Sequence, residues 1–338
     1  MKARHTYLTR RRVLALSGAG FLAATAARTE APAILGTAPA TRQITGKAFA
    51  TTWRVTVPDN GQPEALRGDI ETLLSGIDRM LSPWRDDSEI TAFNRTGPGG
   101  KRVSAETAFV AQSALDVARA SDGWFDPSVG PLVARYGFGP IEGDAAEDGA
   151  PPLWHALGVD GNRLEKTKSG VTMDLCGIAK GRALDLMANR LMDAGYSDFL
   201  IDLGGELVAR GNHPAGRPWQ VAVEDPRPDA NGGAGVLRLA DGAVATSGLR
   251  AQSYALSGHT YSHIIDPRHA VPVEGAIASV SVLAQDAMTA DGWATALTAA
   301  GEDGPALARR QAIAALFLFH DGKSLRSETT GGFDRFLL

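Results

Sequence analysis

The sequence contains very little cysteine, no excess of positive charge and no long hydrophobic run. Its 338 residues include one cysteine, Cys176, so neither an intramolecular disulfide nor a zinc site with several cysteine ligands can form. A formal net charge of −4 gives no electrostatic footprint for nucleic acid. With 44% hydrophobic and 21% charged residues, the composition is typical of one or two globular domains with a substantial core.

The first forty residues are expected to be an export signal and a linker. Thr9 to Leu14, Thr-Arg-Arg-Arg-Val-Leu, has the pattern of a twin-arginine signal. The apolar stretch that follows, Val13 to Ala27, is too short and too weakly hydrophobic for a lasting membrane span. We therefore expect a twin-arginine signal peptide and linker at residues 1–40, a folded domain at residues 41–338, and a periplasmic protein without a stable membrane anchor. The alternative is the basic, amphipathic start of a cytosolic protein.

A stretch from Val171 to Arg210 organises the rest of the chain. Its pattern predicts a strand at 171–175, a glycine-containing turn at 176–181, a helix, and a second strand at Phe199–Leu203. A helix N-terminus favours an anion, and Lys180 in the turn adds a fixed positive charge. The Walker A spacing is absent, so we interpret this as a phosphate-facing turn of another kind. The alternative is a βαβ turn whose lysine is simply solvated.

Periodicity elsewhere predicts helices and strands without a regular βαβ rhythm. Apolar residues at helical spacing predict helices at 64–81, 104–120 and 289–300. Apolar runs predict strands at 48–57, 219–223 and 277–283, a pair of strands at 236–239 and 243–246, and a last buried strand at 313–319. This order predicts an α+β fold, a single catalytic domain with mixed sheets and flanking helices, rather than a doubly wound sheet.

Three groups of residues could carry chemistry. Asp291 and Thr295 are four residues apart, which places a carboxylate and a hydroxyl on one helix face. Such hard oxygens suit Mg²⁺, although most pairs of this kind are surface or capping residues. His263 is either a general base or ligand-holding residue, or a histidine satisfied by hydrogen bonds at a strand end. The aromatic residues Trp124 and Phe125, on a loop with an acid, form either a flat-ring pocket or a core-capping turn.

Taken together, the motifs resemble the ApbE family of FAD:protein FMN transferases. Five stretches match in the family's order: Ser82-Pro83-Trp84 through Ser88-Glu89-Ile90; Gly123-Trp124-Phe125-Asp126-Pro127 through Val129-Gly130-Pro131-Leu132; Asp174-Leu175 with Ile178-Ala179-Lys180-Gly181; His263-Ile264-Ile265-Asp266-Pro267-Arg268; and Ala290-Asp291 with Ala294-Thr295. Any one motif is weak, but five in order over roughly residues 46–338 are specific. The resemblance implies an ApbE-like α+β domain.

The resemblance also implies a reaction and a site. FAD is then a substrate in a deep pocket, and FMN moves from it to a Thr or Ser hydroxyl of a flavin-accepting membrane or periplasmic protein, with release of AMP. Mg²⁺ is expected on the pyrophosphate, held by the Gly177 backbone carbonyl, Asp291 and Thr295. His263 is the expected base, with Asp266 nearby. The FAD contacts carried over by position are Phe49, Trp84, Trp124, Phe125, Asp126, Asp174, Lys180 and Ile265.

Four positions depart from the usual family pattern. Ala270 stands where glycine is common, Phe49 where methionine is common, Cys176 where serine or another small residue is frequent, and Gly177 where alanine is common. A backbone carbonyl ligand survives the change at Gly177. None of the four departures removes Asp291, Thr295, Lys180 or His263, so activity is expected. The departures are compatible with a divergent branch, such as the one serving the flavin-bearing membrane regulator of nitrous oxide respiration. The alternatives are a periplasmic FAD carrier without transfer and an FAD pyrophosphatase that uses water as acceptor.

Overall fold

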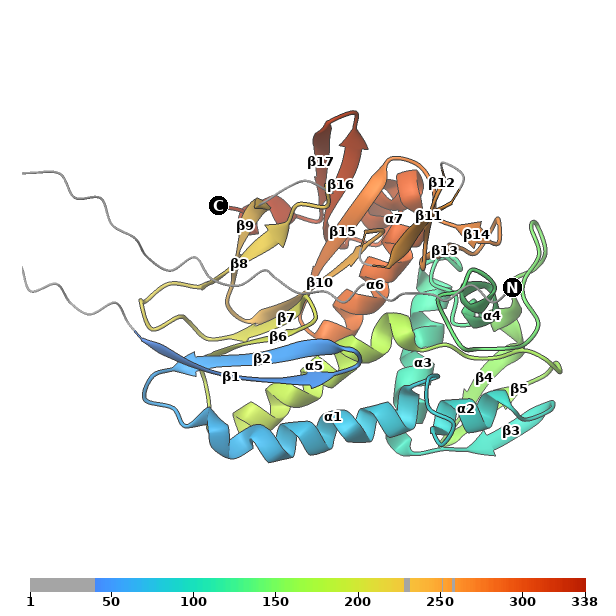
Figure 1. Ribbon diagram of the computed structural model, residues 1–338, viewed down its shortest axis with the longest axis horizontal. Coiled ribbons are helices and arrows are strands. Elements are labelled where there is room, and N and C mark those ends of the chain that lie inside the picture. The colour runs from blue at the N-terminus through green and yellow to red at the C-terminus, as the bar shows by residue number, and fades with distance from the viewer. Residues whose placement is uncertain (1–39, 228–231, 251, 257–258) are drawn as a thin grey trace, which may run out of the picture. The chain divides into compact units, whose positions relative to one another are not determined.

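The computed structural model describes residues 40–338 except 228–231, 251 and 257–258 (Figure 1). The predicted signal peptide and nearly all of the linker lie outside the described residues, so the export signal stays a prediction. The described residues lie in one compact unit. None of the helices in this part of the chain is both long enough and apolar enough to cross a membrane.

An eight-stranded antiparallel sheet forms the centre of the fold. Its strands, in spatial order, are β1 (Thr41–Ala48), β2 (Thr51–Pro58), β6 (Phe199–Leu203), β7 (Glu206–Arg210), β10 (Gly242–Gly248), β15 (Ile277–Ala284), β16 (Ala314–Asp321) and β17 (Ser324–Thr330). Every neighbouring pair in this sheet is antiparallel. Antiparallel strands need no helical crossover between them, and the α+β prediction is confirmed.

The central strands are buried on both faces of the sheet. On β16, Ala315 and Phe317 belong to the larger core, whereas Leu316 and Leu318 belong to a second core. Successive side chains of a strand point to opposite faces, so the two cores lie on opposite sides of the sheet. This double burial explains why residues 314–319 form a nearly continuous apolar run in the sequence.

Helices cover one face of the sheet. In Figure 1, α5 (Cys176–Asp193) and α6 (Ala287–Ala299) lie against the strands, with α1 (Arg67–Leu81) beside α5 and α3 (Ala105–Ala120) in contact with both α5 and α6. Asp286 caps α6 by accepting the N–H of Thr289 at 2.7 Å. At Gly181 a Cβ atom would lie 2.7 Å from Cα of Met288, so only glycine allows α5 and α6 to approach this closely.

The opposite face is covered by a smaller hairpin, β8 (Trp219–Glu224) and β9 (Gly233–Leu239). Trp219 and Leu237 pack there against β16, and the 3₁₀ helix η4 (Phe333–Phe336) closes this second core with Phe333. The remaining elements are short: η1 (Pro63–Leu66), α2 (Glu89–Asn94), β3 (Gly99–Arg102), α4 (Gly130–Arg135), η2 (Leu153–Ala156), β4 (Leu157–Asp160), β5 (Arg163–Lys166), β11 (Ser253–Leu256), β12 (His259–Ser262), β13 (Ile265–Asp266), β14 (Val271–Pro272), η3 (Gly301–Asp303) and α7 (Gly304–Arg310).

The predicted strand and turn at the start of the central stretch are wrong. Residues 171–175 belong to no strand, and the turn predicted at 176–181 is the beginning of α5. The backbone of Met173 is bound by the side chain of Asn94 instead of by a neighbouring strand. Residues of β-like composition form a strand only where another strand lies alongside, and the local sequence does not report this.

Three further strand predictions need correction. The strand predicted at 48–57 is interrupted by a two-residue hairpin turn at Phe49 and Ala50, with φ of 48° and 58°. This turn contains no glycine or asparagine, so it gives no turn signal. β9 and β10 are not paired with each other, since β9 pairs with β8 and β10 lies between β7 and β15. The strand predicted at 313–319 is followed by another, β17.

Candidate active site

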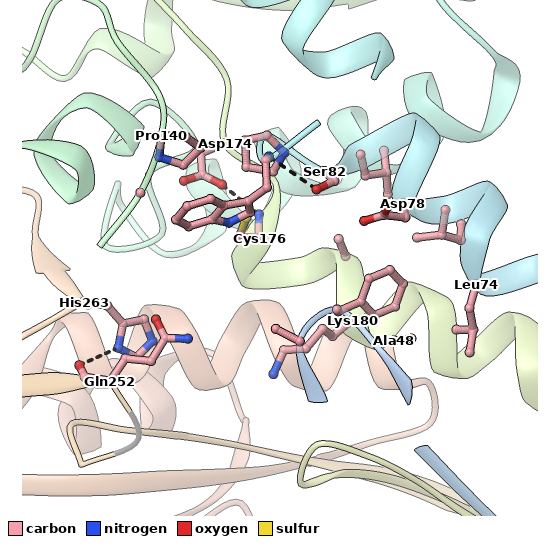
Figure 2. Close-up of a pocket in the computed structure, with 18 of the residues that line it drawn as sticks. Ala48, Leu74, Asp78, Ser82, Pro140, Asp174, Cys176, Lys180, Gln252 and His263 are labelled. Carbon is pink, nitrogen blue, oxygen red and sulfur yellow. Dashed lines mark hydrogen bonds between the residues drawn. The ribbon is translucent and has the colours of Figure 1, made fainter. Parts of the chain in front are cut away.

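A cavity of about 790 Å³ lies where five separate segments of the chain meet. Its walls come from the β1–β2 turn, from α1 and the loop after it, from residues 133–140, from the start of α5, and from Gln252 with His263 (Figure 2). This volume is in the range of small-molecule and cofactor sites. Among the residues predicted from the sequence, five line it: Phe49, Trp84, Asp174, Lys180 and His263.

Two aromatic residues stand at this cavity. Phe49 lies at the β1–β2 turn, where the backbone takes a left-handed conformation. Trp84 is 67% exposed, so its indole is open to solvent. An exposed indole has an apolar face that is free to stack on a planar ring. Both residues could therefore contact the flat ring of a ligand in the cavity.

Lys180 belongs to a charged cluster that sequence reasoning found only in part. Its Nζ donates a hydrogen bond to Glu206 Oε1, and Glu206 is buried. Burial alone would lower the pKa of Lys180, but the nearby carboxylates of Glu206 and Asp291 hold this pKa above its ordinary value. Glu206 was not predicted. It follows the Gly204-Gly205 turn at the start of β7, and an acid directly after paired glycines was the only local signal for it.

The structure brings the three predicted metal ligands together. Oδ2 of Asp291 accepts the N–H of Gly181 at 2.9 Å, and Oγ1 of Thr295 donates to the carbonyl oxygen of Gly177 at 3.3 Å. Thus one turn of α6 faces the first turns of α5. Burial, and then the nearby charge of Glu206, raise the pKa of Asp291 to about 7.

These residues fit a magnesium ion. A carboxylate, a hydroxyl and a carbonyl are hard oxygen donors, and Mg²⁺ normally keeps further positions for water and phosphate. Two carboxylates, Glu206 and Asp291, share one ammonium group here, and Glu206 Oε2 is buried without a hydrogen-bond partner among the described residues. A cation would offset this excess of negative charge. In the same part of the chain, no group of three His, Cys, Asp or Glu side chains could hold a metal ion.

His263 has a defined hydrogen bond at the cavity wall. Its Nδ1 lies 3.3 Å from the carbonyl oxygen of Gln252 (Figure 2). A carbonyl only accepts, so Nδ1 carries the proton and the neutral ring keeps a lone pair on Nε2. Burial lowers the pKa of His263, which favours the neutral ring at pH 7.

Asp266 does not join His263 in the structure. It is absent from the cavity wall, and its Oδ1 accepts the N–H of Arg268 at 2.8 Å. Its Oδ2 lies 2.8 Å from Nδ1 of His269. Asp266 therefore acts as a turn residue in this conformation, as its position before a proline indicates.

Three other predicted FAD contacts are buried away from the cavity wall. Phe125 packs against the start of α5, where its ring lies 3.1 Å from the place that a Cβ on Gly177 would take. The ring centroid of Trp124 lies 4.0 Å from the guanidinium carbon of Arg268. Ile265 belongs to a small separate cluster with Leu132. None of these three side chains lines the cavity.

Asp126 is a buried acid that is only half satisfied. Its Oδ1 accepts hydrogen bonds from N and Oγ of Ser128, at 2.7 and 2.5 Å. Its Oδ2 is buried without a hydrogen-bond partner among the described residues. Burial raises the pKa of Asp126 to about 6. A free acceptor of this kind suits a ligand that donates a hydrogen bond.

The arrangement is suited to chemistry at a phosphate. The first turn of α5 and Lys180 offer positive charge at the cavity, and Asp291 with Thr295 offers hard oxygens on the facing helix. A neutral histidine can take a proton from a nucleophile. A cationic environment stabilises the charge that builds on phosphoryl oxygens in a transfer reaction.

Comparison with known proteins agrees with this geometry. The sequence profile of the ApbE family matches residues 49–317. The FAD:protein FMN transferase of Salmonella typhimurium is 32% identical over 325 residues, which cover 91% of this chain and 93% of that protein. The FAD:protein FMN transferase of Vibrio cholerae is 32% identical over 311 residues, which cover 87% of this chain and 92% of that protein.

Solved structures give the same result. The flavin transferase ApbE from Vibrio cholerae superposes with a TM-score of 0.78 at 30% identity, covering 89% of this chain and 100% of that one. The flavinyl transferase ApbE of Pseudomonas stutzeri, in its apo form, superposes with a TM-score of 0.77 at 31% identity, covering 88% of this chain and 97% of that one. The chain is thus an enzyme that belongs to the ApbE family of FAD:protein FMN transferases.

Proposed function

We propose that this enzyme moves FMN from FAD to a Thr or Ser hydroxyl of an acceptor protein, with Mg²⁺ at the pyrophosphate and AMP as the leaving group. The family supports flavin transfer. The observation that carries the finer proposal is the meeting of Asp291, Thr295 and the Gly177 carbonyl between two helices, next to Lys180. These are groups that bind a divalent cation and a phosphate together.

In the proposed reaction, the acceptor hydroxyl attacks the phosphorus on the FMN side of the pyrophosphate. A bond forms between the hydroxyl oxygen and that phosphorus, and the bond to the bridging oxygen breaks, so AMP leaves with that oxygen. The hydroxyl proton goes to Nε2 of His263, whose Nδ1–H is held by Gln252. Lys180, kept protonated by Glu206, offsets charge on the phosphoryl oxygens.

Magnesium would be held by Asp291, Thr295 and the carbonyl of Gly177. When bound, it would supply charge stabilisation at the phosphoryl oxygens and orient the pyrophosphate. Burial keeps the Asp291 carboxylate in a water-poor position between α5 and α6, where a charge interaction is stronger than at the surface. The Gly181 N–H orients that carboxylate from the other side.

FAD is the proposed occupant of the cavity. Trp84 and Phe49 offer aromatic faces to a planar ring, and Asp174 offers a carboxylate to its polar edge. For Trp124, Phe125, Asp126 and Ile265, which do not line the cavity, the proposed role is to support the residues around it. The proposed acceptor is a periplasmic or membrane redox protein, in line with the twin-arginine pattern at Thr9 to Leu14.

A transfer assay with a matched pair of variants tests the proposal. The mature protein, FAD and Mg²⁺ are mixed with a flavin-accepting domain, and the denatured acceptor is examined for covalent flavin fluorescence. Thr295→Val should abolish the fluorescent band, and chelation of the metal should do the same. Thr298→Val should leave it intact, because the Thr298 hydroxyl, one turn further along α6, is buried and donates to the carbonyl of Ala294 at 2.8 Å.

The same mixture separates the alternative functions. Release of AMP without labelled acceptor would indicate hydrolysis of FAD by water. FAD binding with neither AMP nor labelled acceptor would indicate a carrier. Transfer that persists in Thr295→Val or in chelator would contradict the proposed metal site while leaving flavin transfer in place.

A further inference from the structure

The segment that leads into α5 is extended but has no neighbouring strand. Residues 171–174 belong to no sheet, yet Val171 and Met173 are fully buried. Buried backbone groups need hydrogen-bond partners. In this segment the partners come from side chains and loops of other elements, and two of these side chains have no part in the proposed chemistry.

Asn94, the last residue of α2, binds the segment as a strand would. Its Nδ2 donates to the carbonyl oxygen of Met173 at 2.9 Å, and its Oδ1 accepts the N–H of Met173 at 2.7 Å. One amide side chain thus satisfies both backbone groups of one residue. The next residue, Asp174, donates its N–H to the carbonyl oxygen of Pro127 at 2.7 Å.

Lys166, at the end of β5, makes the second attachment. Its Nζ donates to the carbonyl oxygens of Val171, at 2.9 Å, and Asn94, at 3.1 Å. The residue is 1% exposed, its ammonium lies 5.0 Å from the ring centroid of Phe93, and no carboxylate lies within ion-pair distance in the described part of the chain. A buried charge without a counter-charge lowers the free energy of unfolding. The presence of Lys166 and its two hydrogen bonds therefore needs an explanation other than stability alone.

What these bonds hold in place is one wall of the cavity. Asp174 lines the cavity and accepts the N–H of Cys176 at 2.9 Å through Oδ1. Three residues after Asp174, α5 carries the Gly177 carbonyl and then, one turn later, Lys180. A shift of the segment would therefore move the carboxylate and the start of the helix together.

We propose that Asn94 and Lys166 are positioning residues of the FAD site. They fix residues 171–174 in place of a sheet partner and so set the position of Asp174 and of the first turns of α5. This inference rests on the proposed function, since it takes FAD as the ligand of the cavity. It assigns a role in substrate binding to two residues that touch neither the cavity nor the proposed metal ligands.

Three variants separate positioning from folding. Lys166→Met keeps the length of the side chain but removes both hydrogen bonds and the buried charge. Asn94→Asp keeps the acceptor for the Met173 N–H but places an acceptor opposite the Met173 carbonyl. The control is Thr107→Val, because Thr107 is equally buried and its hydroxyl donates at 2.5 Å to Glu89, at the other end of α2.

Two measurements are made on the mature protein: thermal unfolding with hydrogen exchange of a peptide covering residues 171–180, and FAD binding followed by flavin fluorescence. Lys166→Met should unfold near the wild-type temperature, because relief of the buried charge offsets the two carbonyls left without a donor, and it should exchange faster in that peptide and bind FAD about tenfold more weakly. Asn94→Asp should also exchange faster and bind FAD more weakly. Thr107→Val should unfold at a lower temperature with unchanged FAD affinity.

Unchanged exchange in the 171–180 peptide of Lys166→Met would overturn the positioning role, and so would FAD affinity equal to that of the wild type. A wild-type protein that binds FAD but labels no acceptor would contradict the proposed function. The FAD affinities of the variants and the wild type would then still decide the positioning role. A wild-type protein that does not bind FAD would contradict both the proposed function and the positioning role. The hydrogen-exchange result would then show only how residues 171–180 are held in place.

Discussion

The half-satisfied acid Asp126 should make the stability of the protein depend on pH in a way that one substitution removes. Its Oδ1 accepts two hydrogen bonds from Ser128, and its Oδ2 is buried without a partner among the described residues. In Asp126→Asn the amide oxygen can still accept both bonds, while the amide nitrogen takes the place of Oδ2. The variant therefore keeps the shape and loses only the ionisation and one acceptor.

The size of this pH dependence follows from the pKa of Asp126 in the folded state. The ordinary value is 3.8, and burial raises the pKa of Asp126 to about 6 in the folded state. The folded state thus binds this proton more tightly than the unfolded state. The resulting stabilisation is complete below pH 4 and is lost as the pH rises through 6. About two pH units correspond to about 3 kcal/mol of unfolding free energy between these limits.

Urea unfolding of the FAD-free protein and of Asp126→Asn, at about pH 4.5 and about pH 7.5, measures this difference. The fixed cost of the new amide group is the same at both pH values, so it cancels when the two differences are compared. Because a pH of about 4.5 already lies above the unfolded pKa of 3.8, the variant should gain about 2 kcal/mol relative to the wild type on going to the higher pH. An equal difference at both pH values would refute the reasoning.

Three other changes have directions set by the structure. With Mg²⁺ saturating, so that Asp291 stays ionised although burial raises its pKa to about 7 in the metal-free protein, the log of kcat/KM for transfer should stay flat as the pH falls to 6.5, because burial lowers the pKa of His263 below that value; a decline that begins above 6.5 would then count against His263 as the base. Gly181→Ala should lower the free energy of unfolding by about 3 kcal/mol, since its Cβ would lie 2.7 Å from a backbone atom of α6, whereas Gly76→Ala, with nothing within 4 Å, should raise it by about 0.5–1 kcal/mol in thermal melts. Ser88→Ala should lower it by about 1 kcal/mol, because Ser88 caps α2 through the N–H of Thr91, and an unchanged melting temperature would contradict that role.

Local sequence patterns predict the structure correctly where the role of a side chain depends only on the helix or strand to which it belongs. The capping serine Ser104 begins a helix where the sequence predicts, and β6 has the predicted bounds. Asp291 and Thr295 were placed on one helix face by their spacing alone, and both face α5 in the structure. The resemblance then indicated what such a pair is for, which periodicity could not.

Local sequence patterns do not predict contacts between segments that are far apart in the chain. Glu206 is separated from Lys180 by 26 residues, and no periodicity predicts that β7 brings the two together. Asn94 and Met173 are 79 residues apart, so the loss of a strand at 171–175 could not be anticipated. His263 and Asp266 are close in sequence, yet a turn directs their side chains to different partners.

The five-segment wall of the cavity also has a consequence for the order of events during folding. Lys47 and His263 both line the cavity, although more than two hundred residues separate them. The β1–β2 hairpin reaches its place only by pairing with β6, where Trp53 lies opposite Leu203. Loop closure over such separations is slow compared with the formation of local helices.

The binding site is therefore a late product of folding, completed after residue 263 has left the ribosome and the first hairpin has docked. Nascent chains and fragments that end between α5 and residue 263 contain Lys180 but lack the His263 wall. A ligand that needs all of these walls can therefore bind only after the chain has folded through residue 263.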